Sequence, residues 1–252
     1  MNMKGAFLIF ALALIIPGIF CAGECPAKGA ADNSLYAELL KRYVKDGLVD
    51  YSGLKKDEEV LDRYLMVLEE VSPEALSKES RFAFYVNAYN AWTIKLILTG
   101  YPGVESIKEL GSFLRSPWKK KICRIDGDLK SLDEIEHEIL RKDFNDPRVH
   151  FAINCASRSC PPLRGEPYEG EILEAQLDDA TRSFINDPEM NRLEGDTLHV
   201  SKIFDWFKED FNDDIPRFFL PYAEGDLKKA LDEGRDKIRV KYLDYDWSLN
   251  GS

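Results

Sequence analysis

The sequence has no excess of positive charge, since 34 Lys and Arg residues stand against 45 Asp and Glu residues in a chain of 252. Proteins that hold nucleic acid phosphates need a basic surface, so DNA and RNA are not expected partners. The basic cluster at residues 115–124 is interpreted as the solvated flank of a strand. Repeats, low-complexity stretches and Ser/Gly linkers are also missing from the sequence, which favours a single domain.

Long apolar runs are scarce as well. The run GAFLIFALALII follows Lys4, ends at Pro17 and is shorter than the about 20 apolar residues of a membrane-spanning helix. Its layout is that of a secretory signal peptide, and cleavage after Gly23 fits the need for small residues. We therefore expect a signal peptide over residues 1–23, one globular domain over residues 24–252, export to the periplasm or cell exterior, and no stable transmembrane span. A retained N-terminal anchor is the alternative.

Cysteine is sparse, with 5 in the whole chain. The four that would remain after cleavage are Cys25, Cys123, Cys155 and Cys160, which are too few for a disulfide scaffold. The fold must therefore depend on its core, and 44% hydrophobic residues, with 14 Phe, 11 Tyr and 4 Trp, can supply one.

Most of the sequence has the apolar periodicity of helices. The stretch at residues 78–99 is apolar nearly all round, which predicts a buried central helix. Further helices are expected at residues 33–47, 57–71, 131–142, 171–186, 203–211 and 216–234. Strands are expected at residues 120–125, 149–154 and 238–247 and in a hairpin that turns at residues 194–196. These few, short strands indicate an α+β fold in which the central helix and its neighbours pack on a small, mainly antiparallel sheet.

The central helix carries two asparagines, Asn87 and Asn90, three residues apart and therefore on one face. A buried amide without partners costs about 1–3 kcal/mol, so both need hydrogen bonds. They either anchor the backbones of neighbouring loops or orient a catalytic histidine or a substrate.

The loop after residues 149–154 favours a nucleophile. Cys155 is followed by small residues that leave room around a thiol, and Arg158 nearby favours its thiolate. Histidine is rare, so the base that such a thiol needs must be His137, His150 or His199.

His150 is the closest in sequence, but alternation along a strand places it on the face opposite Cys155, unless a bulge at Asn154 reverses the order. Two other interpretations of the loop remain open. Cys155 and Cys160 either form a local disulfide or ligate zinc with His150, although the C-x4-C spacing is wide for zinc. We predict no metal and no cofactor.

Four segments, FAFYVNAYNAWTIKLIL, SLDEIEHEILR, DPRVHFAINCASRSCPPL and SKIFDWFKEDF, resemble in this order the blocks of the DUF547 family, over roughly residues 35–220. The family's name declares its function unknown, and bacterial members are often exported single domains. The resemblance implies shared positions at Asn87, Tyr89, Asn90, Glu136, His137, Arg141, His150, Cys155 and Pro161. Plant members tend to keep a cysteine like Cys155 but have serine in place of Cys160, which favours Cys155 as the nucleophile.

The expected fold is also distantly similar to papain-like or transglutaminase-like domains. In those families the nucleophilic cysteine begins the central helix, whereas this helix carries Asn87 and no cysteine. Either the catalytic order is rearranged or the scaffold is inactive.

The leading hypothesis is a thiol-dependent hydrolase or acyltransferase that acts on an amide or ester. Its catalytic residues would be Cys155 as nucleophile, His150 or secondly His137 as general base, and Asn87 as the orienting group; its binding residues would be Asn90, Tyr89, Arg158 and Glu136. Backbone N–H groups of residues 156–159 would bind the oxyanion. The alternatives are a non-catalytic cell-envelope module that binds a peptide or glycan, and a thiol-redox protein. The partner is therefore an unknown peptide, glycan or small acyl substrate.

Overall fold

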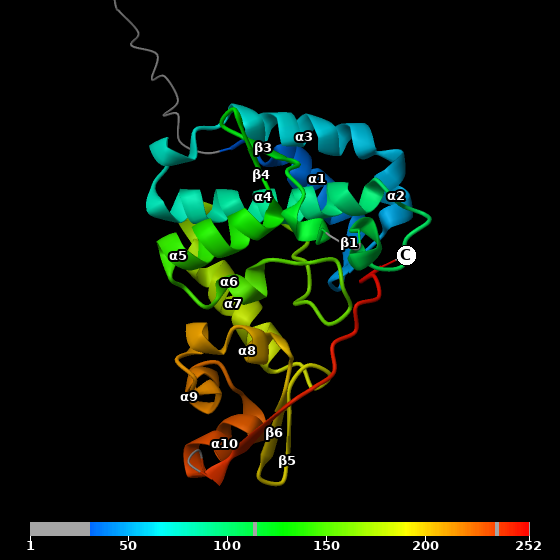
Figure 1. The fold of residues 1–252 in the computed structure, drawn as a ribbon. Helices are drawn as coiled ribbons and strands as arrows, with labels where there is room; N and C mark the ends of the chain where they lie inside the picture. The colour runs from blue at the N-terminus through cyan, green and yellow to red at the C-terminus, as the bar shows by residue number, and fades with distance from the viewer. Residues whose placement is uncertain (1–30, 113–114, 235–236, 252) are drawn as a thin grey trace, which may run out of the picture.

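The computed structural model describes residues 31–112, 115–234 and 237–251. The predicted signal peptide and Cys25 lie outside these residues. None of the helices described is long and apolar enough to span a membrane. Figure 1 shows the earlier helices gathered in the upper part of the molecule and the later helices and the β5–β6 hairpin in the lower part. The C-terminal segment runs from the lower part back to the upper part.

The upper part is built around one buried helix. Helix α4 (Lys78–Leu98) begins at Ser77, whose hydroxyl accepts from the Ser80 N–H, and nearly all its apolar residues are buried. The sequence is apolar on every face of this helix, so neighbours surround it. Those neighbours include the helices α2 (Tyr51–Lys56), α3 (Glu58–Glu70) and α7 (Leu173–Ile185), and α1 (Ser34–Tyr43) packs in turn on α2 and α3. The predicted central helix is confirmed.

A second hydrophobic cluster fills the lower part. It contains Phe184, Phe204, Phe211 and Phe219, which are almost fully buried. The elements around it include α8 (Ile203–Trp206), α9 (Ile215–Phe219) and α10 (Gly225–Gly234). Phe151 packs in this cluster, whereas its neighbours Val149 and Ala152 pack in the upper one. The short helix α6 (Val149–Ala152) therefore joins the two clusters.

The strands form three small sheets. They are the antiparallel pairs β1 (Val44–Lys45) with β2 (Leu48–Val49) and β3 (Cys123–Ile125) with β4 (Asp128–Lys130), and a sheet of β5 (Arg192–Glu194), β6 (Thr197–Val200) and β7 (Arg239–Tyr242). Only the β6–β7 pair is parallel among the strands described. The fold is α+β, as predicted, but the strands do not form the single sheet that we expected.

Short helical turns connect these elements. They are the 3₁₀-helices η1 (Pro73–Ala75), η2 (Ile107–Leu110), η3 (Pro117–Lys119), η5 (Gly170–Ile172) and η6 (Lys208–Phe211). The helix expected at residues 131–142 is a π-helix, η4 (Glu134–Leu140), continued by α5 (Arg141–Phe144).

The structure differs from the prediction at residues 149–154 and at the end of the first helix. Residues 149–154 are not a strand: the N–H groups of Val149 and His150 bond the carbonyls of Asp146 and Pro147, so the Asp-Pro turn begins a helix. A short apolar run does not distinguish a buried strand from one buried helical turn. The first helix ends at Tyr43 rather than near Gly47, because β1 and β2 form a hairpin there.

The start of η4 is fixed by the predicted capping box. The Ser131 N–H donates to Glu134 Oε2 over 2.7 Å, and the Glu134 N–H donates to Ser131 Oγ over 3.2 Å. A hydrogen bond from Lys121 lowers the pKa of Glu134 most, and with those from Ser131 it outweighs partial burial, so this pKa falls to about 2.

A carboxyl group with a depressed folded-state pKa stabilises the fold above its unfolded pKa, and this stabilisation is lost as the pH falls toward the folded value. We therefore expect Glu134→Gln to be less stable than the wild type at pH 7, and the difference to disappear between about pH 4.5 and pH 2. Urea unfolding at several pH values measures it. A stability difference that stays constant over this range would contradict the assignment.

Candidate functional site

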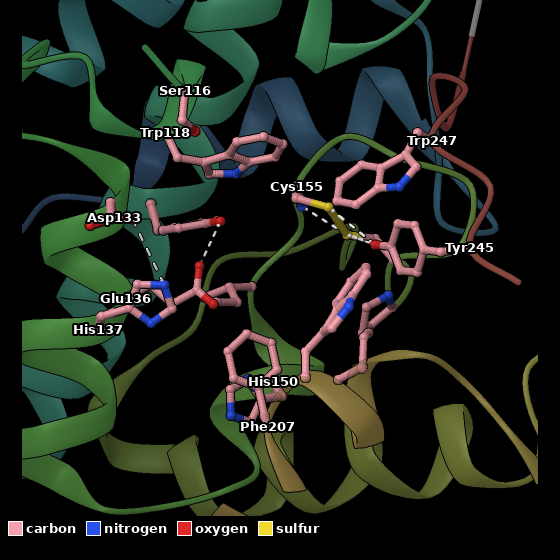
Figure 2. Close-up of a pocket in the computed structure, with 16 residues that line it drawn as sticks. Ser116, Trp118, Asp133, Glu136, His137, His150, Cys155, Phe207, Tyr245 and Trp247 are labelled. Carbon is pink, nitrogen blue, oxygen red and sulfur yellow. Dashed lines mark hydrogen bonds and ion pairs between the residues drawn. A yellow bond between two sulfur atoms is a disulfide. The ribbon is translucent and has the colours of Figure 1, made fainter. Parts of the chain in front are cut away.

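A cavity of about 250 Å³ lies where the two hydrophobic clusters meet, since Ile153 of the upper and Ile203 of the lower cluster both line it. Several elements far apart in sequence supply its other side chains. They include Tyr89 of α4, Glu136 and His137 of η4, His150 of α6, Cys155 and Cys160, and Tyr245 and Trp247 of the C-terminal segment. Figure 2 shows most of these side chains around the pocket.

Cys155 and Cys160 form a disulfide, with Cα atoms 6.3 Å apart, and both residues line the pocket. The Tyr245 hydroxyl donates to Cys160 Sγ over 3.2 Å and lies 3.3 Å from Cys155 Sγ. Ser157 Oγ lies 3.2 Å from Cys155 Sγ and donates to the Tyr245 hydroxyl over 2.8 Å. Of the three states that the sequence left open for these cysteines, the structure has the disulfide.

The asparagines of α4 bind backbone. Asn87 donates to the Tyr168 carbonyl over 2.8 Å and accepts from its N–H over 2.9 Å. Asn90 makes the same pair of bonds with the Ala152 carbonyl and the Asn154 N–H, at 3.0 and 2.8 Å. Neither asparagine is among the residues lining the pocket, so both amides fit the anchoring interpretation rather than the catalytic or binding one.

Three of the four expected oxyanion donors, the N–H groups of residues 156, 158 and 159, are also occupied. The Ala156 N–H donates to Asn154 Oδ1, and the N–H groups of Arg158 and Ser159 donate to the carbonyls of Ser248 and Asp246. The Arg158 side chain is exposed and is not a lining residue of the pocket. One amide beside the sulfurs bonds no oxygen: the Cys155 N–H donates to Cys160 Sγ over 2.9 Å.

His150 is paired with a carboxylate. Its Nε2 lies 2.7 Å from Asp210 Oδ2, and its ring stacks on Phe207 with centroids 4.0 Å apart. Burial opposes ionisation of Asp210, but hydrogen bonds from His150 and Arg141 outweigh it, so the pKa of Asp210 lies well below its usual range. An ionised Asp210 accepts, so Nε2 carries a proton and Nδ1 is the nitrogen left as a base in neutral His150.

Arg141 connects the His150–Asp210 pair to His137. Arg141 Nη1 is 3.1 Å from His137 Nδ1, which must accept because a guanidinium only donates. Arg141 also binds Asp210 through Nε and Nη2, at 2.6 and 2.8 Å. The third histidine, His199, pairs with Glu194 over 3.3 Å and does not line the pocket.

Glu136 is a buried carboxylate, only 9% exposed. Its Oε2 accepts from the Tyr89 hydroxyl over 3.1 Å. Burial, and secondly the charge of Glu136, raise the pKa of Tyr89 well above its usual value, so the phenol stays a donor. The predicted residues Tyr89, Glu136, His137, His150 and Cys155 therefore share one pocket.

In the part of the chain that the structure describes, no group of three or more His, Cys, Asp or Glu side chains is placed to hold a metal ion. The two sulfurs considered as zinc ligands are bonded to each other.

Residues 73–185 match the family model described as "Protein of unknown function, DUF547". The chain carries a DUF547 domain. The matched segment holds α4, η4, α6 and the disulfide loop, and so confirms the resemblance over the inner part of the span that the motifs suggested. No match was found among curated proteins or among solved structures. The likeness to papain-like or transglutaminase-like domains stays a prediction.

Several residues in or beside the pocket, all outside the matched DUF547 segment, were missed from the sequence. Asp210 was inside the quoted block SKIFDWFKEDF, but nothing local linked it to His150, 60 residues away. Tyr245 and Trp247 were placed in a strand, yet β7 ends at Tyr242 and both belong to the segment that crosses the disulfide loop. Only the density of aromatic residues near the C-terminus signalled them.

Proposed function

We propose that this DUF547 domain is an exported, thiol-dependent hydrolase or acyltransferase, which acts on an amide or ester when Cys155 is reduced. One observation carries the proposal: the Cys155 sulfur and the His150–Asp210 pair line the same cavity. A thiol together with a histidine held by a carboxylate provides a nucleophile and a general acid–base group.

The surroundings of Cys155 favour its thiolate. The Tyr245 and Ser157 hydroxyls, which in the disulfide form donate to Cys160 Sγ and to Tyr245, lie 3.3 and 3.2 Å from Cys155 Sγ. Once the two sulfurs separate, these hydroxyls can turn their protons toward Cys155 Sγ, and hydrogen bonds to a charged group stabilise that charge. Burial raises the pKa of Tyr245, which keeps its phenol protonated and able to donate.

Reduction would also free an oxyanion donor. The Cys155 N–H now bonds Cys160 Sγ, and separation of the two sulfurs releases it. The N–H of a nucleophilic residue is a recurrent oxyanion donor. The same disulfide thus occupies both the attacking atom and the amide next to it.

The reaction then follows two steps. The Cys155 thiolate bonds to the acyl carbon, the C–O or C–N bond breaks, and His150, holding the proton lost by the thiol, gives it to the leaving group. Water, or another acceptor, next attacks the thioester, passes a proton to His150 and releases the thiolate. Since Figure 2 shows His150 and Cys155 on separate sides of the pocket, the acyl group would lie between them.

The disulfide itself favours a second candidate, a thiol-redox protein that uses Cys155 and Cys160. In that function Cys155 would attack a partner disulfide and Cys160 would resolve the mixed disulfide.

Labelling with a thiol-reactive probe separates the two candidates. Buried Cys123 is an internal control, because burial raises the pKa of its thiol, and Cys25→Ser in every sample removes the remaining thiol. We expect no labelling of Cys155 before reduction, and after reduction at least about tenfold faster labelling of Cys155 than of Cys123.

The variants Cys160→Ser and Cys155→Ser complete the labelling test. Cys160→Ser should label at Cys155 without any reductant. An unreactive Cys155 in a reduced, folded protein overturns the hydrolase proposal. Rapid reduction of a small disulfide substrate by the reduced protein, with no turnover of esters, would favour the redox candidate instead.

A further inference from the structure

Each charged or histidine side chain that lines the pocket has an ion-pair partner within 4.0 Å except at one residue. Arg141 is neutralised by Asp210, with Nε to Oδ2 at 2.6 Å, and by Glu209, with Nη2 to Oε1 at 3.2 Å. Asp133, the other acidic lining residue, has Oδ1 3.9 Å from His137 Nε2. Among the residues described, Glu136 has no Lys, Arg or His partner within 4.0 Å: the hydrogen bond from Tyr89 brings it no charge, and the charge of Arg141 acts on it only from a longer distance.

An unpaired, buried carboxylate is costly to keep, and a site that keeps one is suited to a ligand that neutralises it. The lining includes no Lys or Arg, so no permanent positive charge among the lining residues opposes the entry of a cation. Glu136 is therefore available to pair with a cation that enters the cavity.

A wall of aromatic rings, which we call the aromatic wall, lines the same cavity. Its members are Trp118, Trp206, Tyr245 and Trp247. The centroid of Trp247 lies 4.4 Å from Tyr245, 5.5 Å from Trp206 and 5.7 Å from Trp118. Figure 2 shows the Glu136 carboxylate on one side of the pocket and Tyr245 and Trp247 on the other.

Ring faces attract cations, most strongly those of tryptophan. One ring of the aromatic wall already binds a cation of the protein, because Lys108 Nζ lies 3.6 Å from the Trp247 centroid, and Lys108 is not a lining residue of the pocket. Trp206 lines the pocket and is 43% exposed, so part of its ring surface is free to contact a ligand.

We infer that the pocket selects a substrate by an organic cation, an ammonium or guanidinium group that pairs with Glu136 while the aromatic wall contacts its other faces. This specificity rests on the proposed function, because it assigns the cation to the amide or ester that Cys155 attacks. A cavity of about 250 Å³ has room for one such group and the few atoms that join it to the acyl carbon. Glu136 is a binding residue in this assignment, and its charge distinguishes the substrate from a neutral molecule of the same shape.

Binding is tested without any reaction, with three probes that share one ring: benzylammonium, benzyl alcohol and benzoate. Each is titrated at pH 7 into the purified chain, oxidised and reduced, and followed by calorimetry and by tryptophan fluorescence. We expect benzylammonium to bind at least about tenfold more tightly than benzyl alcohol, and benzoate most weakly.

Two substitutions on the same π-helix form a matched pair. Glu136→Gln should reduce the preference for benzylammonium to about twofold or less, whereas Glu138→Gln, which removes an exposed charge bound to Lys142, should leave it unchanged. If Glu136→Gln does not fold, Trp206→Leu is the second variant and should reduce the preference at least about threefold. Equal binding of the three probes, or a preference that survives Glu136→Gln, overturns the inference.

A kinetic comparison separates failure of the inference from failure of the proposed function. The reduced protein is assayed on the Nα-acetyl p-nitroanilides of lysine and of norleucine, which has a neutral side chain, and we expect kcat/KM to be at least about tenfold higher for the lysine compound. Equal turnover of both amides leaves the hydrolase and overturns the cation specificity. Cation binding without turnover of either amide or of activated esters leaves the cation site and overturns the hydrolase.

Discussion

Cys155→Ser abolishes the turnover of p-nitrophenyl acetate by the reduced protein, a loss of at least about a thousandfold, because removal of a nucleophile leaves only binding and oxyanion stabilisation. Cys160→Ser is instead active without reductant, since Cys155 has no sulfur to pair with and its N–H is free. The release of p-nitrophenol measures both effects, and mass spectrometry of the trapped intermediate should place one acetyl group on Cys155.

The two variants control each other. Both lose the same disulfide and therefore the same stabilisation of the loop, so they differ only in which thiol remains. If Cys155→Ser and Cys160→Ser are equally active, or if the wild type turns over the ester fully while its disulfide is intact, Cys155 is not the nucleophile.

Asn154→Ala lowers the free energy of unfolding by about 3–5 kcal/mol, because it leaves several buried polar groups without partners at about 1–3 kcal/mol each. Asn154 Nδ2 donates to the Pro161 carbonyl over 2.8 Å, and Oδ1 accepts from the Ala156 N–H over 2.8 Å and from Asn250 over 3.2 Å. Urea unfolding of the reduced and oxidised proteins measures the change.

Asn186→Ala is the matched control for this stability change. Asn186 also bonds backbone groups, namely the Arg182 and Tyr222 carbonyls and the Glu224 N–H, but it is only half-buried, so water replaces its bonds and we expect a loss of about 1 kcal/mol. Equal losses for Asn154→Ala and Asn186→Ala would show that the loop does not depend on Asn154.

Local features of the sequence predicted most of the helices. The all-round apolar pattern of α4, the Ser131–Glu134 capping box and the hairpin turn before Thr197 each depend on residues a few positions apart, and each is in the structure. Residues 149–154 were assigned to a strand because one turn of buried helix and a short strand have the same apolar composition.

The candidate site was predicted as a set of residues rather than as an arrangement. Motif resemblance grouped Glu136, His137, His150 and Cys155, which do line one pocket. The pairing of His150 with Asp210 depends on the packing of the later helices, and the contacts of Tyr245 with the disulfide depend on the path of the last residues. No spacing along the chain encodes either contact, so both required the three-dimensional structure.

The path of the C-terminal segment determines when the pocket can form during folding. Asn250 bonds Tyr51 near the start of the described chain and Asn154 in its middle, and the Arg158 N–H bonds the Ser248 carbonyl. Contacts that join such distant residues form late, since a large loop must close first. We therefore expect the cysteine loop to stay open while the earlier helices assemble, so that both thiols are accessible before the last residues cover them. The aromatic side of the pocket is then expected to be the last part to form.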